Sequence, residues 1–285
     1  MNTSFLARWE SACLLGAVLC YLGATLLLWA QTFFHADDQT KQAERRHKQL
    51  GLGGNAMLAV GAVSHAFSLI GQGSGLFALV AGVAGLFGFI VAVACLVFNR
   101  LGRGAASAFI APVALCGALY SLTDAPLHRA LRPDQVRVLE TQWLAVHVTI
   151  IIIGYAALSF AFAFSLIYLM QEGLLKRKQL KGLWQRLPTL HDADEMIFRT
   201  TSFGLVMLSI GILTAILWMK QHPNYAPLSD PKVLVSLAMW LTFAAYIGVR
   251  QILGWRGRRT NLVVVYGFVL LAISFFGVPH LVGGK

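Results

Sequence analysis

Long apolar stretches recur along the whole chain, and short polar segments separate them. A stretch of about 20 apolar residues is the length that an α-helix needs to cross the hydrocarbon core of a bilayer. The pattern predicts an all-α fold, a polytopic membrane helical bundle with about eight transmembrane helices, in a single transmembrane domain over residues 1–285. The predicted spans are 11–33, 52–72, 76–98, 105–122, 143–170, 198–220, 232–253 and 261–281.

The second predicted span, 52–72, differs from the others in composition. It is rich in Gly and Ala and contains Asn55 and His65. Small residues let neighbouring helices approach closely, so we expect this helix to lie inside the bundle rather than to face lipid.

Composition and charge support a membrane protein. Hydrophobic residues make up 57% of the chain and charged residues only 12%, against about 25% charged residues in soluble domains. The net charge of +11 does not indicate a nucleic-acid-binding protein, because Lys and Arg collect in the cytoplasmic loops of membrane proteins and face anionic lipid there. The expected partners are therefore membrane lipids, and no nucleic acid is expected.

The distribution of basic residues predicts the orientation. With eight spans, sixteen of the 23 Lys and Arg residues fall on the side opposite the two termini. That side should be cytoplasmic, so both termini should face outside. On the cytoplasmic side, the basic, leucine-rich segment 172–187 is typical of an interfacial helix on the inner leaflet, or alternatively of a docking surface for a cytosolic partner. The acidic residues of 188–195 are interpreted as a helix start.

The cysteines do not indicate redox chemistry. Cys13, Cys20, Cys95 and Cys116 all lie in apolar stretches, and none belongs to a CxxC pair. Disulfide exchange needs a resolving cysteine beside the nucleophile. We therefore expect these side chains to be buried as small hydrophobic groups.

Two histidines lie inside predicted spans at similar depth. His65 should lie about 10 Å and His147 about 6 Å from the outer end of its helix, and His280 falls in the same layer. Two imidazoles from different helices can hold a haem iron between them. A hydrogen bond to a neighbouring helix is the alternative for each histidine. A proton relay is a third, although the predicted spans contain no Asp or Glu to complete it.

A short outer segment ends in Asp230, Pro231 and Lys232. Asp before Pro is typical of a helix start, with Asp as the N-cap and Pro at the first helical position. Lys232 could meet an anionic group there, such as a haem propionate, or extend to the outer headgroups.

Ordered motifs in the second half of the chain resemble the cytochrome c assembly protein family, of the CcsA/ResC type. They include Trp143-Leu-Ala-Val-His147, Asp230-Pro-Lys232 and Gly254-Trp-Arg-Gly-Arg-Arg259, followed by Gly267-Phe. The resemblance implies haem handling at the outer face, with His147 as a haem-ligating histidine. It also places Trp143, Asp230 and Lys232 beside the haem, and His280 there by position.

The chain departs from that family's pattern in its tryptophan-rich outer segment. Pro227 and Ser229 stand where tryptophans would be expected, and Val233 replaces a glutamate. The chain therefore looks closest to the smaller HemX/YpjD-like branch, and no catalytic reaction is assigned to it.

Three functions remain open. The first is haem binding or handling in a bacterial cytoplasmic (inner) membrane, with His65 and His147 as ligands. The second is a non-enzymatic scaffold or regulator that acts with other cytochrome c assembly or haem-synthesis proteins. The third is a small-molecule transporter, which lacks the usual support of an internal repeat or a pair of broken helices.

Overall fold

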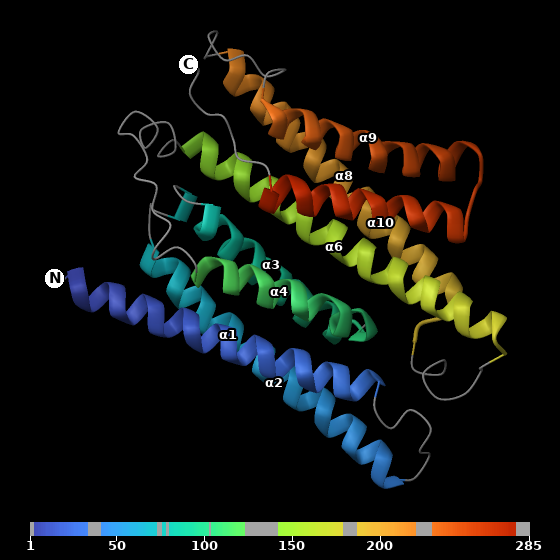
Figure 1. The fold of residues 1–285 in the computed structure, drawn as a ribbon, viewed down its shortest axis with the longest axis horizontal. Helices are drawn as coiled ribbons and strands as arrows, with labels where there is room; N and C mark the ends of the chain where they lie inside the picture. The colour runs from blue at the N-terminus through green and yellow to red at the C-terminus, as the bar shows by residue number, and fades with distance from the viewer. Residues whose placement is uncertain are drawn as a thin grey trace. The chain divides into compact units, whose positions relative to one another are not determined.

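In a computed structural model, the described part of the chain is helical and contains no strand. It comprises residues 3–33, 41–72, 76–77, 80–102, 104–122, 142–178, 187–220 and 230–277. The α-helices are α1 (Thr3–Phe33), α2 (Lys41–Gln72), α3 (Val80–Arg100), α4 (Ser107–Leu122), α6 (Gln142–Lys176), α8 (Leu190–Lys220), α9 (Pro231–Ile252) and α10 (Arg258–Ala272). Two short elements accompany them, η2 (Gly104–Ala106) and the π-helical η4 (Ile273–Gly277) (Figure 1).

Each predicted span corresponds to one of these helices, so the polytopic helical bundle is confirmed. Seven of the described helices are long and apolar enough to cross a membrane, and α4 is shorter, with 16 residues. At the rise of an α-helix, that length is about 24 Å, somewhat less than the hydrocarbon core. The chain is a multi-pass membrane protein.

The chain divides into two compact units. Unit 1 comprises residues 1–130 and 173–188, and unit 2 comprises residues 131–172 and 189–285. Unit 1 thus contains α1 to α4, and unit 2 contains α6 up to Glu172 together with α8, α9 and α10. The expected single domain over 1–285 stays a prediction.

Close helix contacts hold unit 1 together. In α1 and α2, the Ser64 hydroxyl donates to the Cys13 carbonyl oxygen at 2.7 Å. In α3 and α4, Gly88 and Gly117 face each other, and a Cβ on Gly117 would lie 2.8 Å from the Gly88 Cα. Small residues therefore set the helix spacing, as is common in membrane bundles.

Within unit 1 the second span is only partly buried, whereas we expected it to lie inside the bundle rather than to face lipid. One face of α2 packs inside unit 1 and includes Leu58 and His65, whereas Val60, Val63 and Ile70 are exposed on the other face. The Gly and Ala residues permit close packing on the buried face, and the exposed aliphatic face suits contact with lipid. Of the cysteines, Cys95 is buried as expected, but Cys116 is exposed.

In unit 2, α6 packs closely against its neighbours. A Cβ on Gly204 of α8 would lie 2.7 Å from Leu158 Cγ and 3.2 Å from the Gly154 carbonyl oxygen, both on α6. Phe162 of α6 stacks on Phe268 of α10, with 4.1 Å between ring centroids. These contacts make α6 a central packing element of this unit.

A tight turn joins α9 to α10. Gly254 and Gly257 have φ angles of +66° and +97°, values that glycine adopts without the steric cost of a Cβ. The Gly254-Trp-Arg-Gly257 motif therefore has a structural role, which is to reverse the chain between two antiparallel helices.

The predicted interfacial segment 172–187 lies only partly within the described residues. Its first residues, up to Lys176, continue α6. Residues 179–186 lie outside the described part of the chain, so the interfacial helix stays a prediction.

Candidate functional site

His147 lies near the start of α6, and two acceptors on α8 contact its ring. Its Nδ1 lies 3.0 Å from the Gly211 carbonyl oxygen and 2.9 Å from Thr214 Oγ1. The Thr214 hydroxyl itself donates to the Gly211 carbonyl oxygen at 2.7 Å. Because the Thr214 proton is used in that bond, both partners of Nδ1 accept.

This arrangement determines the tautomer of His147. Two acceptors at Nδ1 require a proton there, so the lone pair of the neutral ring is on Nε2. A histidine that binds a metal through one nitrogen usually donates its other N–H to a carbonyl or another acceptor. His147 therefore has the donor arrangement that an axial ligand of haem iron needs.

Other predicted site residues lie at the same end of unit 2. This end brings together the start of α6, the end of α8 and the start of α9 (Figure 1). Trp143 is 53% exposed and lies one helical turn before His147, so the two side chains share a face of α6.

Asp230 caps α9, as the sequence predicted. Its carboxylate accepts a hydrogen bond from the Lys232 backbone N–H at 2.9 Å, and Pro231 follows it at the first helical position. Asp230 is 2% exposed. The helix cap thus accounts for the position of Asp230 without a ligand. Contact of Asp230 or Lys232 with haem stays a prediction.

His65 of α2 is completely buried in unit 1. Its Nδ1 lies 3.3 Å from the Tyr21 hydroxyl, and the rings of Tyr21 and Phe89 pack against it. Its Nε2 has no hydrogen-bond partner among the described residues. This nitrogen faces α3 and α4, since a Cβ on Gly85 would lie 3.3 Å from it and 2.9 Å from Ser121 Oγ.

The surroundings of His65 do not fit a porphyrin. An iron bound to Nε2 would need an open plane beside that atom, whereas Gly85 and Ser121 bound the space there. His65 and His147 also belong to different units, so their expected pairing on one haem stays untested. His280 lies outside the described residues.

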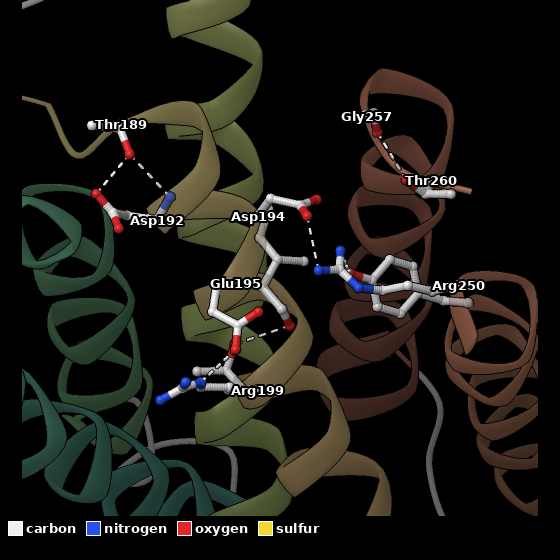
Figure 2. Close-up of polar contacts among 11 residues, drawn as sticks. Thr189, Asp192, Asp194, Glu195, Arg199, Arg250, Gly257 and Thr260 are labelled. Atoms are coloured by element: carbon white, nitrogen blue, oxygen red, sulfur yellow. Dashed lines mark hydrogen bonds and ion pairs between the residues drawn. The ribbon is translucent and has the colours of Figure 1, made fainter. Parts of the chain in front are cut away.

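An ion pair that the sequence analysis did not anticipate links α8 to α9. Arg250 Nη2 lies 2.8 Å from Asp194 Oδ2, with both side chains less than a tenth exposed, and Figure 2 shows the two groups pointing toward each other. Arg250 also donates to the Tyr246 hydroxyl at 3.4 Å and lies over the ring of Phe198. The pair is thus enclosed at the end of unit 2 opposite His147.

Asp194 was missed because the helix start was expected too late. The span was predicted from residue 198, but α8 begins at Leu190, after a cap in which Thr189 Oγ1 accepts from the Asp192 N–H at 3.1 Å (Figure 2). The acidic residues do lie in the first turns of a helix, as predicted. Asp194 in addition pairs with Arg250, and the signal available in the sequence was an arginine inside an apolar stretch.

The model of a family described as cytochrome c assembly protein matches residues 70–284. A cytochrome c biogenesis protein CcsA of Parasynechococcus marenigrum (strain WH8102) is 32% identical over 176 residues, which cover 51% of this chain and 57% of the relative. Another from Chlamydomonas reinhardtii is 29% identical over 190 residues, covering 66% of this chain and 52% of the relative.

The chain spans little more than half the length of these relatives. No solved structure matches the chain. His147 lies within the residues that the family model matches, whereas His65 lies before them.

Proposed function

Because the chain belongs to the cytochrome c assembly protein family, we propose that it binds or handles haem at the end of unit 2 that contains His147. His147 would hold the haem iron through Nε2. The observation that carries this assignment is the pair of acceptors at Nδ1, the Gly211 carbonyl oxygen and Thr214 Oγ1. The family resemblance of the surrounding motif supports it independently.

The residues of this chain would bind and orient the group. Bound haem would supply an iron that accepts the Nε2 lone pair of His147. The hydrogen bonds from Nδ1 would hold the ring in one orientation and raise its basicity as a ligand. Trp143, on the same face of α6, would contact the group, and Lys232 would pair with an anionic substituent.

We do not include His65 as a ligand in this proposal. Its Nε2 is enclosed by α3 and α4, and ligation there would require the helices of unit 1 to separate. His280 is the further candidate ligand that the sequence offers.

The proposed setting is a bacterial inner membrane. Both termini and the His147 end of unit 2 would face outside, and the basic ends of the helices would face the cytoplasm. The proposed partners are other cytochrome c assembly or haem-synthesis proteins. Membership of the HemX/YpjD-like branch also belongs to the proposal.

The test is the visible absorption spectrum of the protein, purified in detergent from haem-replete cells, oxidised and then reduced with dithionite. We expect a Soret band that is lost in His147→Ala and kept in His191→Ala, an exposed histidine of the same unit. Free imidazole should restore part of the band to His147→Gly. A spectrum with no Soret band in the parent protein, together with haemin binding that His147→Ala leaves unchanged, would exclude the proposal in favour of the scaffold or regulator function.

A further inference from the structure

Unit 1 contains a polar cavity at the end opposite His65. It has a volume of about 270 Å³ and lies between the end of α1, the first half of α2 and the turn from α3 to α4. Its lining includes Gln31, Thr32, His47, Asn55 and Asn99. Of the described residues that line it, none is acidic, and most can donate a hydrogen bond.

A chain of side-chain hydrogen bonds orients the amides in this cavity. The Ser107 hydroxyl donates to Asn99 Oδ1 at 2.5 Å, and Asn99 Nδ2 donates to Asn55 Oδ1. Both amide oxygens therefore already accept from the protein. The amide N–H groups of Asn55, and the second N–H of Asn99, are the groups left to donate, which favours an anion as the ligand.

The second wall of the cavity is also held in place by hydrogen bonds. His47 Nδ1 lies 3.1 Å from the Gln31 carbonyl oxygen, so this nitrogen is the donor. His47 Nε2 lies 3.4 Å from Gln31 Nε2. These contacts tie α2 to the end of α1 and fix the shape of the cavity rim.

Cations stand next to two of the lining residues in the sequence. Arg46 and Lys48 lie on either side of His47 in α2, and Arg100 follows Asn99 at the end of α3; all three side chains are exposed. Glu44 is the acidic residue of the first turn of α2. Among the described residues, the first turns of α2 and the end of α3 therefore carry a net positive charge that attracts anions.

The length of α2 places this cavity at the depth of the lipid headgroups. With 32 residues, the helix is about 48 Å long, well beyond the hydrocarbon core of about 30 Å. The excess lies at its polar first turns, where His47 and its basic neighbours occur. Basic pockets between transmembrane helices at this depth bind phosphate-bearing headgroups.

We propose that this cavity is a binding site for a phosphate group. The amides of Asn55 and Asn99 donate to the phosphate oxygens, and the exposed cations of the adjacent helix turns, Arg46, Lys48 and Arg100, balance its charge. The phosphate can come from an acidic phospholipid or from a soluble phosphate compound. The site lies in unit 1 and does not depend on the proposed haem function of unit 2.

The experiment measures binding to the full-length protein in detergent by the shift of its thermal unfolding midpoint. The probes are dihexanoyl phosphatidylglycerol, dihexanoyl phosphatidylcholine and inorganic phosphate. We expect a saturable rise of the midpoint with phosphatidylglycerol and little effect of phosphatidylcholine, whose headgroup is neutral overall. An effect of phosphatidylglycerol alone identifies a lipid source, and an effect of inorganic phosphate identifies a soluble one.

Two variants localise the binding. Arg46→Glu with Lys48→Glu changes only exposed side chains and should weaken binding about tenfold or more, because each basic group near an anion contributes to its attraction. Asn99→Asp places a negative charge inside the cavity and should have a similar effect. The control Arg256→Glu with Arg259→Glu changes two exposed charges of unit 2 and should leave the affinity unchanged. The proposal is overturned if neither phosphatidylglycerol nor inorganic phosphate binds saturably. It is also overturned if the cavity variants and the control bind the probe equally well.

Discussion

The carboxylate of Asp194 lies 2.8 Å from the guanidinium of Arg250, and this buried pair joins the first turns of α8 to the last turns of α9. Asp194 Oδ1 has no hydrogen-bond partner among the described residues. The buried negative charge of Asp194 is therefore balanced by the guanidinium of Arg250. Removal of one partner from a buried pair leaves an uncompensated charge, which costs far more than the pair contributes.

We therefore expect Asp194→Asn and Arg250→Met each to destabilise the protein by about 3 kcal/mol or more. The double variant Asp194→Leu with Arg250→Met should regain most of that loss, because no charge then remains buried. Chemical denaturation in detergent measures both effects. Glu195→Gln is the matched control, since its pair with Arg199 is exposed and such pairs contribute about 0.5 kcal/mol. Equal losses in the control and in Asp194→Asn would contradict the prediction.

The hydroxyl of Thr214 should strengthen haem binding by His147, because it accepts a hydrogen bond from Nδ1 of that ring. Thr214→Val keeps the shape of the side chain but removes the acceptor 2.9 Å from His147 Nδ1. We expect it to lower haem affinity about tenfold, since partners of ligating histidines contribute on that order. Thr214→Ser keeps the hydroxyl and should retain normal affinity. Haemin titration followed at the Soret band measures this, and equal affinities of the two variants would show that the hydroxyl has no such role.

His65 should be a packing residue rather than a haem ligand. His65→Ala removes a fully buried ring and should destabilise the protein by about 2–4 kcal/mol through the cavity that it leaves. It should nevertheless leave the Soret band of folded protein intact. Loss of that band in His65→Ala, with folding confirmed by circular dichroism, would support the histidine pair expected from the sequence.

The spacing of α3 and α4 depends on glycine at position 117. A Cβ there would lie 2.7 Å from the Ala84 carbonyl oxygen, so Gly117→Ala forces the two backbones apart. We expect a loss of about 1–3 kcal/mol, as in other overpacked interfaces. Gly248→Ala is the control, because a Cβ at that position meets nothing within 4 Å. A thermal unfolding midpoint for Gly117→Ala equal to that of the control would refute the close approach.

The orientation can be tested at the turn between α9 and α10. Arg256 is exposed there, on the side predicted to be cytoplasmic. In a variant without its native cysteines, Arg256→Cys should react with a membrane-impermeant maleimide only after intact cells are permeabilised. Labelling in intact cells would reverse the proposed orientation.

Much of the helical architecture follows from local sequence. Apolar stretches of membrane length predict the helices, because a backbone in lipid must satisfy its own hydrogen bonds. The cap of α9 by Asp230 was also predictable, since the cap and the N–H that it accepts are two residues apart. Helix starts with polar first turns were harder to predict, as α2 and α8 both begin before the apolar stretch that marks the span.

Contacts between helices depend on their relative rotation, which a single sequence does not contain. His147 was identified as a site residue from its motif, but its acceptors Gly211 and Thr214 lie more than 60 positions along the chain. Asp194 and Arg250 are likewise separated by more than 50 positions, and they meet because α8 and α9 pack antiparallel. The polar cavity likewise depends on helix packing, because Asn55 of α2 and Asn99 of α3 meet there. Hydropathy thus decides where each helix lies along the chain, and packing between helices decides which polar groups meet.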